Sequence, residues 1–242
     1  GDVVLKGEFA LVALRCVTLD PGTSGTGGGA VFEQAVDGRQ LGPVRLWIEG
    51  RIRRLMIERS IVGPVRARAG GIVESLEVRD SIVQAIPTAA TSDPALSLAD
   101  GEVALERVTV MGAASVHRLR ASETILDGVA AVEDVQRGCV RFSAWVTGSV
   151  LPRQYESVEI PAGAPIFTAR FFGFPGYAQV LDEADAQIVG SGDRGSITQG
   201  AQDGSEMGAF ACERRAIKER SLRIKLQEFM PIGLIPVLIH VT

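Results

Sequence analysis

One six-residue pattern recurs five times in this chain and constrains its fold more than any other feature. An apolar residue is followed by two mostly polar residues, a small or β-branched residue, Ile or Thr, and another apolar residue. The copies occupy 14–19 (LRCVTL), 57–62 (IERSIV), 78–83 (VRDSIV), 105–110 (LERVTV) and 121–126 (ASETIL). Because self-similarity at such intervals is the signature of stacked structural units, the pattern predicts a repeat architecture.

Short alternating stretches precede the copies, for example 44–48 (VRLWI) and 73–76 (VESL), and further short apolar stretches follow them. Each turn therefore holds two or three strands separated by bends. The fold class that we predict is all-β, a right-handed parallel β-helix, or solenoid, in which stacked turns share one core. An antiparallel sandwich or barrel also has short strands and regular turns, but it gives no reason for one hexapeptide to recur.

The organisation of the chain changes after residue 143. Proline and aromatic residues become frequent, and 212–229 has apolar residues at near-helical spacing. The sequence predicts solenoid turns over 1–143 and a C-terminal cap over 144–242, because an open solenoid end exposes strand edges and apolar core. The cap is expected to contain one amphipathic α-helix, at about 212–229, and an apolar closing strand at 234–241.

Composition narrows the range of partners. A formal net charge of -4 argues against nucleic acid, which is bound through clustered Lys and Arg. No apolar run is long enough for a spanning helix, so we expect no membrane insertion. The three cysteines are far apart and suggest neither a zinc site nor a disulfide framework. The glycine-rich stretch 21–29 lacks the lysine of a phosphate-binding loop and reads as a protruding loop, and no cofactor is predicted.

Few residues suggest catalysis. The chain has only two histidines, so it offers little material for a catalytic triad or a His-rich metal site. The best catalytic candidates are Glu58, Asp80 and Glu106, which occupy the polar positions of three hexapeptides. Carboxylates on adjacent turns can bind a cation or act as acid and base, as in β-helix polysaccharide lyases and hydrolases. Arginines alternate with them, which favours a salt-bridged solvent face instead.

The densest group of carboxylates, at 182–185, provides the candidate metal ligands Asp182, Glu183 and Asp185. A solvated loop is the preferred interpretation of this group. Four other glutamates, Glu206, Glu213, Glu219 and Glu228, are interpreted as solvated charges on the predicted C-terminal helix.

Beyond the repeated coils, four further motifs stand out: 138–143 (GCVRFS), 175–179 (PGYAQ), 203–210 (DGSEMGAF) and 222–229 (LRIKLQEF). Together with the coils, they resemble a family of large, uncharacterised bacterial right-handed parallel β-helix proteins associated with phage-tail-like, contractile injection gene clusters. The resemblance covers nearly the whole chain and provides no catalytic residue. It implies a solenoid module of a bacterial extracellular or tail-like particle.

The sequence thus favours a non-enzymatic structural or recognition module. The expected partners are other protein subunits of an assembly, further copies of this chain, or a surface glycan. The alternative is a glycan-binding or glycan-cleaving β-helix protein of the polysaccharide lyase or hydrolase type.

Overall fold

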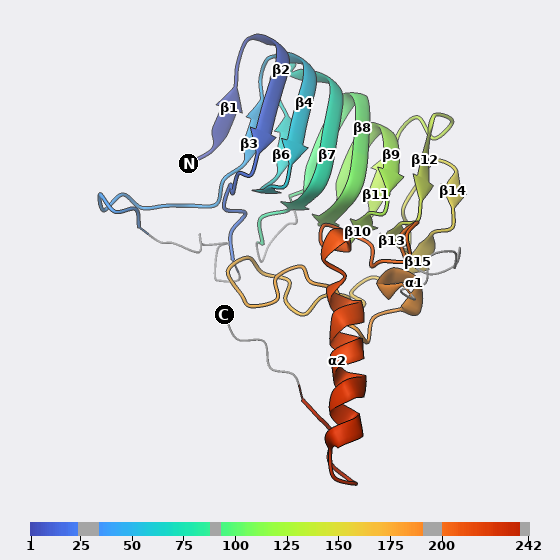
Figure 1. Ribbon diagram of the computed structural model, residues 1–242. Helices are drawn as coiled ribbons and strands as arrows, with labels where there is room; N and C mark the ends of the chain where they lie inside the picture. The colour runs from blue at the N-terminus through green and yellow to red at the C-terminus, as the bar shows by residue number, and fades with distance from the viewer. Residues whose placement is uncertain (24–33, 88–92, 191–199, 238–242) are drawn as a thin grey trace.

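The fold is a stack of parallel β-strands wound as a solenoid (Figure 1). The structure is a computed structural model and describes residues 1–23, 34–87, 93–190 and 200–237. All pairings between its named strands are parallel. The predicted all-β parallel solenoid is therefore confirmed. The glycine-rich stretch lies mostly outside the described residues.

Successive turns contribute strands to three ladders, which we call A, B and C in chain order. Ladder A contains β1 (Val3–Leu5), β3 (Leu46–Ile48), β6 (Val65–Ala67), the starts of β8 (Leu96–Met111) and β9 (Ala114–Ser122), and β11 (Ala130–Val132). Ladder B contains β2 (Glu8–Arg15), β4 (Arg51–Glu58), the first part of β7 (Ile72–Gln84), the middle of β8, the end of β9, β12 (Gly138–Arg141) and β14 (Gln154–Tyr155). Ladder C contains β5 (Ile61–Val62), the ends of β7 and β8, β10 (Ile125–Leu126), β13 (Ala144–Val146) and β15 (Val158–Ile160).

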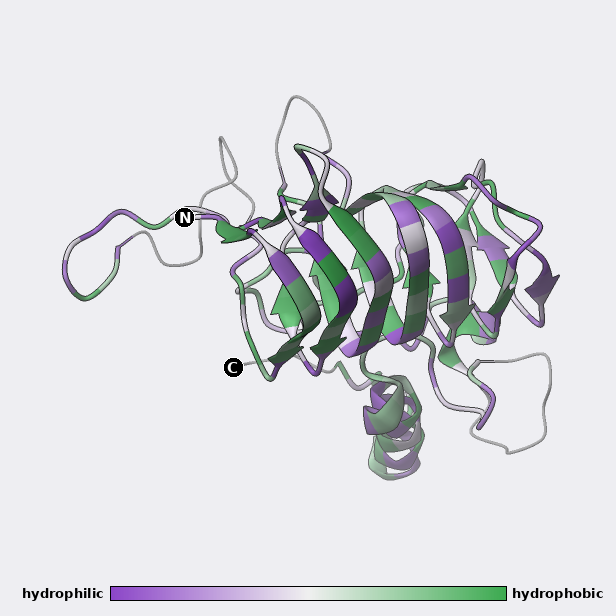
Figure 2. Ribbon diagram, turned by 90° about the horizontal axis from the view of Figure 1, so that it is seen from above, coloured by the Kyte–Doolittle hydropathy of each residue, from purple (hydrophilic) through white to green (hydrophobic). Residues whose placement is uncertain are grey.

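The core consists of apolar columns that run from turn to turn. In ladder B, Leu55, Leu76, Val103 and Leu119 are in register on successive strands, and all four are buried. Their neighbours along each strand point outward and are mostly polar, which gives the alternating bands in Figure 2. Each turn alone leaves an apolar side uncovered, so stacking of turns supplies the burial that stabilises the fold.

The hexapeptide marks the bend between ladders B and C. Its third residue has a left-handed backbone, with φ between 44° and 56° at Cys16, Arg59, Asp80, Arg107 and Glu123. Phe142 and Glu156 have the same backbone conformation in the next two turns, outside the five copies found in the sequence. A single left-handed residue turns an extended chain sharply, because its φ departs from that of the flanking strand.

Where the residue after the bend is serine, its hydroxyl forms hydrogen bonds with the backbone. The Ser81 hydroxyl accepts a hydrogen bond from the Ser60 backbone N–H at 3.0 Å and donates to the Arg79 carbonyl at 2.6 Å. The Ser143 hydroxyl likewise accepts from the Thr124 N–H at 3.0 Å. These hydroxyls bond backbone groups of the turn at the bend, where an unpaired buried N–H would be costly.

The parallel ladders continue to Ile160, beyond the predicted boundary at 143. The segment that follows contains α1 (Ala186–Val189), a short 3-10 helix (Ala211–Glu213) and α2 (Arg215–Phe229). α2 agrees with the helix predicted at about 212–229. Of the predicted closing strand, 234–237 is not a strand, and the remainder lies outside the described residues.

The segment after Ile160 lies against the outer side of ladder C. Ile82, Met111 and Ile125 of that ladder form a second apolar cluster with Tyr177 and Met207 from the segment. The helix α2, however, points away from the solenoid (Figure 1), and Ala216 is its only buried residue. The expected helical end cap is corrected accordingly: the chain before α2 covers a side of the solenoid, and α2 does not cover its last turn.

Glu206 also differs from its prediction as a solvated helix charge. It precedes α2, is fully buried, and accepts a hydrogen bond from the Ala216 N–H at 2.8 Å. Burial raises the pKa of its carboxyl. The first N–H groups of a helix have no partner within the helix, and Arg214 at the N-cap position makes no side-chain hydrogen bond to them. Glu206 therefore acts as the capping acceptor at the start of α2.

Candidate functional site: the charged face of ladder B

The outer face of ladder B carries charged side chains in register. Arg15, Glu58, Arg79 and Glu106 occupy the second hexapeptide position on successive turns and alternate in sign. Arg15 pairs with Glu58 at 2.9 Å, and Arg79 pairs with Glu106 at 3.3 Å. Ser122 and Arg141 continue this column on the next two turns.

A second outward column lies beside the first and consists of Met56, Glu77, Ala104 and Arg120. Arg54 forms a bidentate ion pair with Glu77 on the next turn, with both nitrogen–oxygen distances 2.8 Å. Arg120 pairs with Glu102 one turn back. Between Glu77 and Arg120, the ladder position is taken by Ala104, whose short side chain leaves space above the sheet.

The space above Ala104 is a shallow open groove of about 460 Å³. Its charged lining residues are Arg54, Glu77, Arg79, Glu106, Arg120 and Arg141. Four arginines and two glutamates line the groove, and a third glutamate, Glu102, pairs with Arg120, so the lining carries a small excess of positive charge. Arginine-lined surfaces of this kind favour anionic ligands.

Arg141 differs from the other groove arginines. Its Nε donates to the Ser122 hydroxyl at 3.1 Å, and it has no carboxylate partner in the described part of the chain. Its neighbour in register on the next turn is Tyr155, which is 52% exposed. The Tyr155 ring packs edge-on against Phe142, with the ring centroids 5.8 Å apart. An unpaired cation and an ordered, exposed aromatic ring therefore stand together at one end of the groove.

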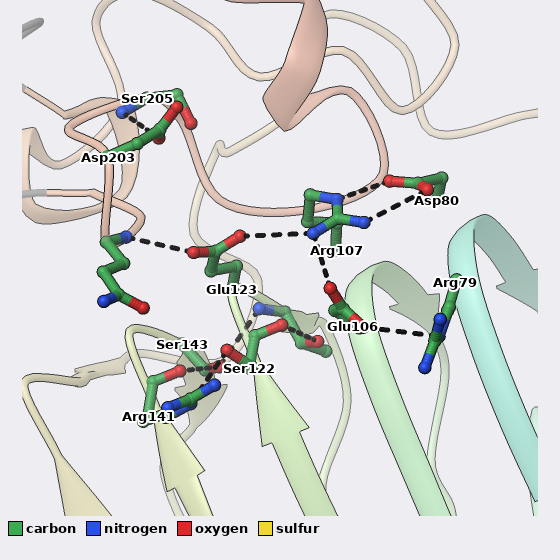
Figure 3. A network of polar contacts seen from close by, with 12 residues as sticks. Arg79, Asp80, Glu106, Arg107, Ser122, Glu123, Arg141, Ser143, Asp203 and Ser205 are labelled. Carbon is green, nitrogen blue, oxygen red and sulfur yellow. Dashed lines mark hydrogen bonds and ion pairs between the residues drawn. The ribbon is translucent and has the colours of Figure 1, made fainter.

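A polar network lies where the chain bends away from the groove (Figure 3). Arg107 donates to Asp80 at 2.5 Å and to Glu106 at 2.7 Å, and it lies 3.9 Å from Glu123. The hydrogen bonds from Arg107 to Asp80 raise the pKa of its guanidinium, against the opposing effect of burial. Arg107 thus links the bends of three successive turns.

Glu123 is the most enclosed carboxylate of this network. It accepts a hydrogen bond from the Gln202 backbone N–H at 3.2 Å, and burial raises the pKa of its carboxyl. A small pocket of about 240 Å³ adjoins it, lined also by Arg107, Asp203 and Cys212. A carboxyl with a raised pKa beside a pocket is suited to proton transfer.

The three catalytic candidates are not brought together as a free acid/base set. Asp80 and Glu106 both bind Arg107, whereas Glu58 lies farther along the ladder and pairs with Arg15. In each case the carboxylate already forms an ion pair with an arginine.

The three metal candidates do not converge either. Asp182 and Glu183 both pair with Arg223 of α2, at 2.5 Å and 3.2 Å. Asp185 caps α1 by accepting a hydrogen bond from the Gln187 N–H at 2.8 Å. Within the described residues, no group of three or more His, Cys, Asp or Glu side chains is arranged to hold a metal ion.

Arg120, Arg141 and Glu123 were not singled out from the sequence. The signal for Arg141 was present, because 140–145 (VRFSAW) repeats the bend with Arg at the second position. The match is obscured by its fifth residue, Ala144 in place of Ile or Thr, and by its sixth, Trp145 in place of an aliphatic residue. The groove at Ala104 depends on neighbours from other turns, and only the register shows it.

Comparisons with protein families, characterised proteins and solved structures found no match to this chain. Among the described residues, no helix has the length and apolar character needed to cross a bilayer.

Proposed function

We propose that this chain is a non-enzymatic recognition module, a right-handed β-solenoid within a larger phage-tail-like or surface assembly. The observation that carries the proposal is the arginine-rich groove on the broad outer face of ladder B. The groove is shallow and open, which suits an extended ligand better than a small molecule that must be enclosed.

The pairing of the charged side chains supports a binding role. A catalytic acid or base must be able to exchange a proton with a substrate. Glu58, Asp80 and Glu106 instead form ion pairs with arginines, which compete with a substrate for the carboxylate oxygens.

The C-terminal helix supports membership of an assembly. Leu222, Leu226 and Phe229 lie on one side of α2 at helical spacing, and all three are exposed, Phe229 to 85%. Exposed apolar surface of this extent is typical of a protein contact. In this proposal α2 contacts another subunit of the particle, while the preceding segment shields ladder C.

Glycan cleavage is the second candidate function, and Glu123 favours it. This carboxyl has a raised pKa, adjoins a pocket, and directly follows Ser122, which lines the groove. A glycan in the groove would therefore pass close to a group suited to donating a proton.

One paired experiment separates the two functions. The protein is screened against a panel of bacterial polysaccharides for binding and, on the same panel, for release of reducing ends. Binding without release is the expected result. If reducing ends are released by the wild type but not by Glu123→Gln, the protein is a glycan-cleaving enzyme and not a recognition module. If the protein neither binds nor cleaves any polysaccharide, both functions are refuted and a structural role is left.

A further inference from the structure

The residues of the groove identify a ligand class. We infer that the groove binds a carboxylated glycan chain, with Arg141 pairing one of its carboxylates. This inference rests on the proposed recognition function and specifies its ligand.

The arginines favour carboxylates. A guanidinium presents two parallel N–H donors that match the two oxygens of a carboxylate. Arg141 has no carboxylate partner within the described residues, so it can pair with a ligand without breaking an existing ion pair. The Arg120 side chain is 59% exposed, and it forms an ion pair with Glu102 at the margin of the groove.

The glutamates of the groove indicate that charge is not the only feature recognised. Glu77 and Glu106 also line the groove, and their oxygens accept hydrogen bonds, so they suit a ligand that carries hydroxyl donors as well as anions. The net charge of -4 opposes binding of a nucleic acid backbone. A uronic-acid glycan instead presents hydroxyl donors between its carboxylates, and those hydroxyls match the glutamates.

The groove geometry fits a chain that lies along the stack. Neighbouring strands are about 4.8 Å apart, which is close to the length of one sugar unit in an extended chain. Tyr155 continues the Arg141 column at the next turn and exposes its ring. Packing against Phe142 holds the Tyr155 ring in place, and a sugar can stack on its exposed surface.

The test measures binding of polygalacturonate, dextran and polyglutamate to the whole chain by biolayer interferometry. The proteins are the wild type, Arg141→Ala, Tyr155→Ala and Arg137→Ala. Arg137 is a matched control, because it is an exposed arginine near β12 that does not line the groove. Arg141→Ala and Arg137→Ala each remove one positive charge, so both variants lose the same amount of general electrostatic attraction for an anionic polymer. Circular dichroism melting checks that every variant is folded.

We expect polygalacturonate to bind, and Arg141→Ala to weaken it about tenfold, as loss of one charged hydrogen-bonded pair implies. Arg137→Ala should stay within about twofold of the wild type, the effect of screened surface charge. Tyr155→Ala should weaken binding without changing its dependence on salt.

Other outcomes overturn the inference in distinguishable ways. Equal binding of dextran, or equal effects of Arg141→Ala and Arg137→Ala, would refute a carboxylate site and leave glycan recognition standing. Polyglutamate bound as tightly as polygalacturonate would refute the role of hydroxyls and indicate an acidic protein partner. If neither the anionic nor the neutral glycans of the wider panel bind, the proposed recognition function fails as well.

Discussion

The solenoid turns and the segment after Ile160 are stabilised in different ways. In the turns, one position buries the same kind of side chain repeatedly, as the column of Leu55, Leu76, Val103 and Leu119 illustrates. In the C-terminal segment, burial depends on individual contacts that occur once. The Tyr177 hydroxyl donates to Gln84, 93 residues earlier in the chain, and no other Tyr–Gln pair repeats that contact within the described residues.

This difference means that stability is shared along the solenoid but local in the segment. Each turn is supported by the turn before and after it, so a defect in a central turn weakens two interfaces. α2 has no comparable support, because Ala216 is its only buried residue. Substitutions of the same chemical type should therefore have very different effects in the two regions.

The largest expected effect comes from a matched pair of leucine substitutions. Leu76→Ala removes a fully buried side chain in a central turn and should lower the free energy of unfolding by about 3 kcal/mol. Leu222→Ala in α2, where the side chain is 48% exposed, should change it by less than about 0.5 kcal/mol. Urea unfolding followed by circular dichroism measures both. Similar losses at the two sites would show that α2 is packed in solution.

The same contrast explains what could be predicted from the sequence. The solenoid was predictable because the bend imposes the same residue sizes on each turn, so that Ser81 and Ser60 occupy equivalent positions 21 residues apart. The boundary at 143 was too early, since the turns containing Phe142 and Glu156 keep the bend but not the apolar pattern. Turns that lack the apolar pattern of the hexapeptide cannot be recognised from the local sequence.

The candidate site was predictable only in part. Glu58 and Glu106 could be placed on one face, because they share a position in the hexapeptide. The groove depends instead on a small residue, Ala104, lying in register with Glu77 and Arg120, and one-residue changes of register would destroy it. The position of Glu123 against Gln202 depends on a contact across 79 residues, for which the sequence contains no signal.

The next prediction concerns the hydroxyl at the bend. Ser81→Ala removes the acceptor of the buried Ser60 N–H and should cost about 1–2 kcal/mol of unfolding free energy. Ser75→Ala, on the outward face of the same strand, is the control and should have little effect. Thermal and urea unfolding of the two variants provide the comparison. Equal stabilities would mean that the hydroxyl is a consequence of the bend and does not stabilise it.

A smaller effect is expected from pH at the junction between the two regions. Asp127 of the solenoid pairs with Arg170 of the segment, and burial raises the pKa of Asp127 to about 6 despite that pair. The folded state therefore binds a proton more tightly than the unfolded state, whose Asp pKa is near 3.8. The resulting stabilisation is fully present below about pH 3.8 and is lost as the pH rises through about 6.

Asp127→Asn tests this linkage. Between pH 7 and pH 5 the wild type should gain about 1 kcal/mol more stability than the variant, which lacks the titrating group. Urea unfolding of both proteins at pH 7 and pH 5 measures the two gains in stability. Other carboxylates contribute equally to both proteins, so their effects cancel when the gains are subtracted. A larger gain in the variant would mean that the ion pair with Arg170 outweighs burial and keeps Asp127 ionised.

The smallest effect should come from a single ion pair of the charged face. Arg79 and Glu106 are 3.3 Å apart on adjacent turns, with side chains 49% and 40% exposed. A double-mutant cycle to alanine should give a coupling of about 0.5 kcal/mol or less, and salt should reduce it. Such a value would mean that the alternating charges contribute little to the stability of the turns, which is compatible with a role in binding. A coupling several times larger would instead assign the charged face to stability, and would weaken the case for the groove as a binding surface.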